Sequence, residues 1–173
     1  WCRVLFEDST TPMSAQDVYI DNVLVKDLVI PNDTSYINSY AFYNSKFTSV
    51  TIGNGVSYID NNAFRNSKMT TVVISDEVVE IGFNAFDYCT NLQTLTIGDG
   101  VQHIGEYAFA FCSSLESIAL PDSVTTIGNN AFNACIALKN INIPDSVTTI
   151  CGDAFYVCYN LTSITIPNSV ISI

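Results

Sequence analysis

Positive charge is scarce in this sequence, which has only six lysine and arginine residues and one histidine against 17 aspartate and glutamate residues. The net charge of −11 repels a nucleic-acid backbone, and the six cations form no basic stripe along the chain. The same scarcity argues against docking on an anionic membrane surface. We therefore expect no nucleic-acid partner.

Long apolar runs are also lacking, because none approaches the roughly 20 residues that a membrane-spanning helix needs. The chain starts at Trp1 without a signal-peptide pattern, and it stops at Ile173 in the middle of the repeat described below. We therefore expect a fragment of a longer protein, with no direct membrane insertion in this fragment.

Catalytic signatures are missing too. The sequence has no Gly-x-Ser-x-Gly motif, no phosphate-binding glycine loop and no Cys-x-x-Cys pair. The single histidine, His103, takes a repeat position that other repeats fill with Tyr, Glu or Thr, which indicates an outward and tolerant place. We expect no catalytic, cofactor-binding or metal-binding residues, and therefore no enzyme activity in this chain.

What the sequence does contain is an internal repeat. The dipeptide Ala-Phe recurs at 41–42, 63–64, 85–86, 108–109, 131–132 and 154–155, with spacings of 22, 22, 23, 23 and 23 residues. Alignment on these anchors gives the unit LxxIxIPxxVxxIGxxAFxxCxx, which is clearest over residues 115–137. Its opening LxxIxI is the strand signature of leucine-rich repeats, whose period is roughly 20 to 29 residues.

The unit predicts a solenoid. In residues 118–120, period-2 alternation sends Ile118 and Leu120 inward and Ala119 outward, as in one short strand per coil. The spacing around Val124, Ile127 and the Ala-Phe motif suggests a turn and a short helical piece. The expected fold is a β-rich α/β solenoid with one parallel sheet and short helical or turn segments on the other side.

We divide the chain at residue 28. Residues 28–173 hold about six full repeats and a partial seventh, which we expect to be truncated. Residues 1–27 do not follow the unit, and we interpret them as an N-terminal cap or hairpin segment, because two apolar runs flank Asp21-Asn22. Solenoids need such covers because an open end exposes the core.

Two columns of equivalent residues lie inside the expected coils. The six motif phenylalanines should form one stacked column. Cys89, Cys112, Cys135 and Cys158 recur every 23 residues, and we interpret them as buried free thiols, although neighbouring coils come close enough for disulfides. Cys2 and Cys151 lie out of register, and no pairing is predicted for them.

A third column follows each strand and always holds Asn or Asp. Its members are Asn32, Asn54, Asp76, Asp99, Asp122, Asp145 and Asn168. Such side chains stabilise tight turns by accepting hydrogen bonds from nearby backbone, which is the interpretation that we favour. The alternative is calcium bridging the successive aspartates.

The combined pattern of residues 117–132, SIALPDSVTTIGNNAF, and of residues 142–150, NIPDSVTTI, resembles the BspA-like leucine-rich repeat family. The resemblance extends from Leu28 to the end of the chain. It implies a right-handed solenoid in an extracellular or cell-surface protein, often linked to adhesion. The first two repeats depart from the pattern, since they are one residue shorter and carry Ser45 and Ser67 in the cysteine column.

Two candidate binding surfaces follow from the register. The outward positions on the concave side are Val29, Thr51, Val73, Thr96, Ala119, Asn142 and Thr165, all small or uncharged, a composition that also suits a tightly stacked sheet. Aromatic residues around the Ala-Phe motifs on the convex side are Tyr40, Tyr43, Tyr88, Tyr107, Phe111, Tyr156 and Tyr159, which either anchor a ligand or pack between coils.

The leading hypothesis is a non-catalytic, surface-exposed interaction or adhesion module. Its partner would be a protein or a glycan, with host matrix and another cell surface as candidates. Two alternatives remain open: a structural spacer within a larger surface protein, and an accessory repeat domain of an enzyme whose catalytic part lies outside this fragment.

Overall fold

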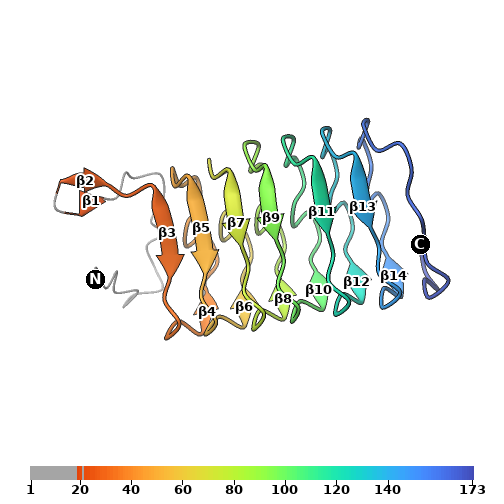
Figure 1. The fold of residues 1–173 in the computed structure, drawn as a ribbon, viewed down its shortest axis with the longest axis horizontal. Helices are drawn as coiled ribbons and strands as arrows, with labels where there is room; N and C mark the ends of the chain where they lie inside the picture. The colour runs from red at the N-terminus through yellow and green to blue at the C-terminus, as the bar shows by residue number, and fades with distance from the viewer. Residues whose placement is uncertain (1–18, 21) are drawn as a thin grey trace.

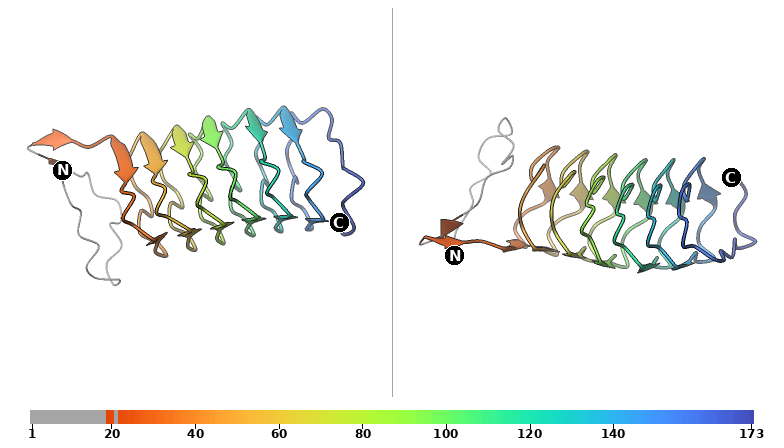
Figure 2. Two further views of the ribbon diagram at one scale, coloured as in Figure 1. Left: turned by 60° about the horizontal axis from the view of Figure 1, so that its bottom comes forward. Right: turned by 90° about the horizontal axis from the view of Figure 1, so that it is seen from above.

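The computed structural model describes residues 19–20 and 22–173, whose coils stack in a row along the longest axis of the molecule (Figure 1). Each coil has a strand on one side, a tight turn, a second strand of two residues, and a return segment with the Ala-Phe motif. The two turned views show the same row of coils (Figure 2). No described helix is long and apolar enough to cross a membrane.

The first strand of each coil pairs in parallel with its counterpart in the next coil. These strands are β3 (Asp27–Ile30), β5 (Ser49–Ile52), β7 (Thr71–Val73), β9 (Thr94–Thr96), β11 (Ser117–Ala119) and β13 (Asn140–Asn142). Strands β3, β5, β7 and β9 form one sheet, and β11 and β13 form a second ladder beside β9. Val50 lies opposite Val72, and Ile118 opposite Ile141. Pairing between residues one repeat apart confirms the predicted parallel-strand solenoid.

A further parallel sheet, which the sequence did not predict, runs along the coils, and we call it the second sheet. Its strands are β4 (Tyr36–Ile37), β6 (Tyr58–Ile59), β8 (Glu80–Ile81), β10 (His103–Ile104), β12 (Thr126–Ile127) and β14 (Thr149–Ile150). Each buries its isoleucine and turns the preceding residue outward. The expectation of one sheet is wrong, because two residues are too few for a period-2 pattern to be recognised.

The expected helical piece is also wrong, because the described residues contain no helix. An α-helix sends every N–H to the carbonyl four residues earlier. Here the N–H of Ala63 donates to Asp60, whereas that of Phe64 donates to Ala85 of the next coil. Asn62 and Asn66 have positive φ angles of 59°, so the backbone turns alternate N–H groups toward the neighbouring coil. The Ala-Phe segment is therefore a ladder of turns between coils.

The motif phenylalanines form the predicted stacked column. The ring centroids of Phe42, Phe64, Phe86, Phe109, Phe132 and Phe155 are 5.0, 5.1, 5.2, 5.6 and 5.7 Å apart in turn, with interplanar angles of 10° or less. Phe109 is fully buried, with Phe86 on one side and Phe132 on the other. Because each ring touches the next, the column binds successive coils together.

The cysteine column is buried and its thiols are free, as predicted. Each thiol donates to the carbonyl of a phenylalanine in the preceding coil, for example Cys89 Sγ to Phe64 O at 3.2 Å and Cys135 Sγ to Phe109 O at 3.3 Å. Ser67 Oγ makes the same bond to Phe42 O at 2.8 Å. The column therefore requires a small donor. Cys151 is free and half-buried, and Cys2 lies outside the described residues.

The two ends of the row differ in burial. At one end β1 (Tyr19–Ile20) pairs antiparallel with β2 (Val23–Leu24), and Asn22 has a φ of 62°. The boundary at residue 28 and the capping role of the segment before it stay predictions. At the other end Ile164 and Ile166 are 36% and 40% exposed, whereas their counterparts Ile141 and Ile143 are buried. The last coil thus leaves part of the apolar interior open.

Candidate interaction surfaces

The outward residues of the first strands of the coils form one row, as the period-2 alternation predicted. Val29, Thr51, Val73, Thr96, Ala119 and Asn142 are exposed on strands β3 to β13, and Thr165 is exposed beyond them. We call this row the sheet face. Val50 and Ile118, their neighbours along the strands, point into the core. Equivalent residues pair in register from β3 to β9 and again between β11 and β13, and β11 lies beside β9, so the sheet face runs along the coils, and none of its residues is charged.

Six of the seven predicted aromatic residues fall into three groups. Tyr40 packs edge-on against Tyr43, with ring centroids 5.8 Å apart. Tyr88 stacks on Phe111, with centroids 4.3 Å apart and planes 12° apart. Tyr156 and Tyr159, near the last coil, are 62% and 80% exposed. These side chains are therefore spread along the coils and do not form one patch. That any of them binds a ligand stays a prediction.

Tyr107 contacts an aromatic residue that the sequence analysis left out. The ring of Phe83 lies edge-on to that of Tyr107, with centroids 6.2 Å apart, and Phe83 is 43% exposed. Phe83 sits two residues before the motif alanine, where other coils hold Ser39, Asn61, Glu106, Asn129 and Gly152. A position so variable gave no column to detect. The signal was the hydrophobic character of this one residue in an otherwise polar series.

Several of these aromatics have left-handed backbone. Tyr88 and Phe111 both have a φ of 57°, and Tyr107 has a φ of 55°. The left-handed conformation costs roughly 1–2 kcal/mol for most residues and less for asparagine. A stacked ring pair returns only about 0.5–1.5 kcal/mol. Because Asn44 and Asn66 fill the positions equivalent to Tyr88 and Phe111, stacking alone does not account for rings at these positions.

A buried carboxylate precedes Tyr88. Asp87 is 3% exposed, and its Oδ2 accepts from Arg65 Nε at 2.9 Å. Its Oδ1 has no hydrogen-bond partner among the residues that the structure describes. Burial raises the pKa of Asp87 to about 6, although the positive charge of Arg65 opposes that rise. The pair joins the coil of Arg65 to the next one, and sequence alone gave no sign of it.

The row that contains His103 lies on the second sheet. His103 is exposed, as predicted, and pairs in register with Glu80 and Thr126. Burial and then the nearby Glu80 and Asp60 carboxylates raise the pKa of Tyr58, so its hydroxyl stays protonated at neutral pH. The Tyr58 hydroxyl is therefore not activated as a nucleophile by its neighbours.

Two side chains of the turn column accept hydrogen bonds from backbone, as predicted, but from the backbone of the next coil and not from that of their own turn. Asn32 Oδ1 accepts from the N–H of Asn54 at 2.9 Å, and Asp76 Oδ1 accepts from that of Asp99 at 3.0 Å. Each side chain therefore ties its turn to the next coil. In the part of the chain that the structure describes, no group of three or more His, Cys, Asp or Glu residues could hold a metal ion.

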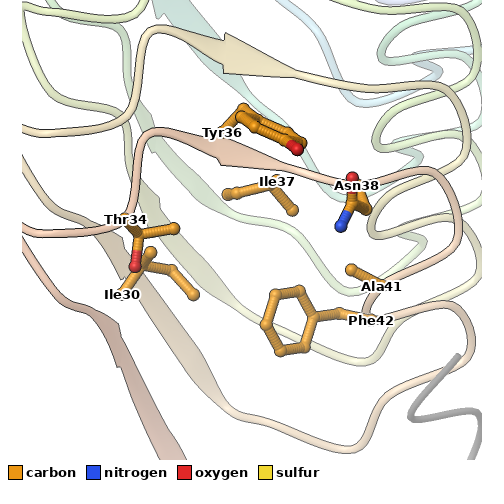
Figure 3. Close-up of a pocket in the computed structure, with 7 residues that line it drawn as sticks. All are labelled: Ile30, Thr34, Tyr36, Ile37, Asn38, Ala41 and Phe42. Atoms are coloured by element: carbon orange, nitrogen blue, oxygen red, sulfur yellow. The ribbon is translucent and has the colours of Figure 1, made fainter. Parts of the chain in front are cut away.

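One small hollow lies beside the first coil. It is lined by Ile30, Thr34, Tyr36, Ile37, Asn38, Ala41 and Phe42 and has a volume of about 50 Å³ (Figure 3). Ligand pockets usually measure roughly 300–1,000 Å³. The hollow is thus too small for an organic ligand.

Comparison with known proteins agrees with this architecture. A family model described as "BspA type Leucine rich repeat region (6 copies)" matches residues 16–137 and 102–173. A leucine-rich cell surface protein from Faecalibacterium prausnitzii A2-165 is 31% identical and has a TM-score of 0.76, over 95% of this chain and 51% of that one. No curated protein matches the chain significantly.

Two further solved structures are similar. The leucine-rich repeat protein TpLRR of T. pallidum is 31% identical over 69% of this chain and 59% of its own, with a TM-score of 0.67. A leucine-rich repeat protein from Bacteroides ovatus ATCC 8483 is 30% identical over 83% of this chain and 46% of its own, with a TM-score of 0.59. The chain thus spans about half the length of these three proteins.

Proposed function

The chain belongs to the BspA-type leucine-rich repeat family, and from this premise we propose that it is a non-catalytic interaction module that binds a protein partner through its sheet face. Leucine-rich repeat proteins generally act in protein interactions. The residues of the sheet face carry the proposal, because they form an outward row of exposed, uncharged side chains along the coils. We place the module outside the cell, which the description of the F. prausnitzii relative as a cell surface protein supports.

The sheet face suits a broad and shallow contact. Strands spaced about 4.8 Å apart put the outward residues of β3 and β13 roughly 24 Å apart. Ser49, Thr71, Ser117 and Asn140 form a second polar row beside the first, with hydroxyl and amide groups for hydrogen bonds. Without charged side chains in the first row, a partner loses little solvation energy on contact. The role that we infer is adhesion to matrix proteins or to another cell.

Binding to purified matrix proteins and immobilised glycans tests the proposal. We expect the wild-type chain to bind at least one matrix protein, and the double variant Thr96→Arg and Ala119→Arg to weaken that binding by about tenfold or more, since two bulky charges would interrupt the row. The control is Gln102→Arg, an exposed position beside the second sheet, which should leave the affinity unchanged.

A spacer would behave differently. Replacement of the repeats by an unrelated solenoid of equal length, in the full-length protein, should abolish attachment if the sheet face binds. Preserved attachment would overturn the proposal in favour of a spacer. Equal effects of the double variant and of Gln102→Arg would overturn the assignment to the sheet face.

A further inference from the structure

Two pairs of aromatic rings lie on the same two coils. Tyr88 stacks on Phe111, and Phe83 lies edge-on to Tyr107, so one ring of each pair comes from each coil. We call these four residues the aromatic corner. Phe83 and Tyr88 are 43% and 41% exposed, which leaves part of each ring open to solvent. The corner flanks the Ala-Phe segments of both coils and is separate from the sheet face.

The backbone gives no reason for three of these rings. Tyr88, Tyr107 and Phe111 all have left-handed φ angles, at positions where other coils carry asparagine. The equivalent positions of later coils are also left-handed and carry Ala134 and Val157, so the backbone conformation belongs to the repeat and does not require a ring. We therefore interpret the rings as contact groups for a partner.

The charge around the corner is negative. The exposed Glu106 immediately precedes Tyr107, and the buried Asp87 immediately precedes Tyr88. Arg65, a cation of the preceding coil, is paired with Asp87. One oxygen of Asp87 remains without a hydrogen-bond donor in the described part of the chain. Because Arg65 balances the charge of Asp87, the exposed carboxylate of Glu106 is the group that favours a cation at the corner.

We propose that the aromatic corner binds an arginine-rich segment of a partner protein. A guanidinium group is planar and stacks on aromatic rings, here the partly exposed rings of Phe83 and Tyr88. Its N–H groups also bind carboxylates, and Glu106 is the exposed carboxylate beside the rings. The proposal rests on the function inferred above, that the chain is an interaction module, and it adds a second surface with a chemically defined partner.

The test uses a fluorescent arginine octapeptide with the whole chain, and binding is measured by fluorescence anisotropy. The double variant Tyr88→Asn and Phe111→Asn removes the stacked pair but keeps the net charge, so a change in affinity reports the rings. We expect it to weaken binding about fivefold or more, since each cation–π contact strengthens binding a few-fold. Asparagine suits left-handed backbone, so the melting temperature should stay equal or rise.

Three controls isolate the corner. Tyr40→Asn makes the same change at a left-handed position in the first coil and should leave the affinity unchanged. Glu106→Gln keeps every ring and should weaken binding a few-fold, with a smaller dependence on salt. A lysine octapeptide carries the same charge but stacks less well, and it should bind more weakly than the arginine peptide.

Other results would overturn the proposal. If the ring variant binds the arginine octapeptide as tightly as the wild type does, attraction by the net charge explains the binding. If instead a neutral glucan hexasaccharide binds and the ring variant loses it, the corner recognises sugar. The ring variant should still bind matrix protein through the sheet face. Matrix binding in the Thr96→Arg and Ala119→Arg double variant tests only the proposed function, and arginine-peptide binding in the ring variant tests only the aromatic corner.

Discussion

The first two coils and the later coils close the Ala-Phe segment in different ways. In the 22-residue coils, Asn44 and Asn66 take the left-handed position after the motif, and Asn66 Nδ2 donates to Asn44 Oδ1 at 3.1 Å. In the 23-residue coils the same position holds Tyr88, Phe111, Ala134 and Val157. The shorter coils thus follow the backbone preference, and the longer coils do not.

The extra residue changes the return to the sheet. In the longer coils a further turn forms, in which the N–H of Leu92 donates to Cys89 O at 3.0 Å. The shorter coils lack that turn, and Phe47 and Met69 fill the interior where the longer coils have leucine. Ser45 Oγ donates to Ser67 Oγ at 2.9 Å in the column that thiols fill elsewhere. Coil length is therefore free to vary where a core residue of suitable size compensates.

The largest expected effect lies in the phenylalanine column, which crosses both kinds of coil. Phe109→Ala should lower the free energy of unfolding by roughly 3–5 kcal/mol, because it removes a fully buried ring between two others. Chemical denaturation measures the loss. Phe155→Ala, at the half-buried end of the column, should cost less. A loss below about 1 kcal/mol at Phe109 would contradict a continuous column.

A smaller effect is expected where the two kinds of coil meet, at Asp87. Its pKa of about 6 in the folded chain exceeds the ordinary value of 3.8, so the folded state binds the proton more tightly than the unfolded state. Stability should therefore fall as the pH rises from about 4 to about 6, and the loss should persist above that range. Asp87→Asn should raise the free energy of unfolding by about 1–2 kcal/mol at neutral pH.

Urea unfolding at pH 4.5 and at pH 7.5 measures this effect. The variant should lose the part of the pH dependence that the wild type shows between these values. The control Asp122→Asn changes an exposed turn carboxylate and should keep the pH dependence of the wild type. If Asp87→Asn is less stable than the wild type at pH 7.5, the ion pair with Arg65 outweighs the cost of burial.

The smallest effect comes from exchanging the left-handed residues. Val157 has a φ of 61°, an unfavourable conformation for a β-branched side chain. Val157→Asn should therefore raise the free energy of unfolding by about 0.5–1 kcal/mol, and the reverse change Asn66→Val should lower it by about 1–2 kcal/mol. Thermal unfolding of both variants checks this. Opposite signs would show that side-chain packing at these positions outweighs the backbone preference.

Features that repeat were predictable from the sequence, and features confined to one junction were not. The stacked phenylalanines and the buried thiols recur at fixed spacing, so one alignment located them. The prediction of a helical piece is wrong because apolar spacing does not report backbone handedness, and Asn62 and Asn66 take left-handed φ angles that a helix excludes. The Arg65–Asp87 pair and the Phe83–Tyr107 contact join residues of adjacent coils. The residue type at their repeat positions changes from coil to coil, so no alignment of the repeats reveals them. Such contacts require the register of the coils to be known.

The buried thiols have a consequence for the chemistry of the chain in oxidising surroundings. Burial raises the pKa of Cys89 to about 12 and that of Cys112 well above its usual range, so almost none of either group is thiolate at neutral pH. Thiolate is the species that alkylating reagents and disulfides react with. A folded copy should therefore keep these sulfhydryl groups intact, and only a copy that opens would be labelled. The rate at which an alkylating reagent labels each cysteine of this column therefore measures how often the coil that holds it opens.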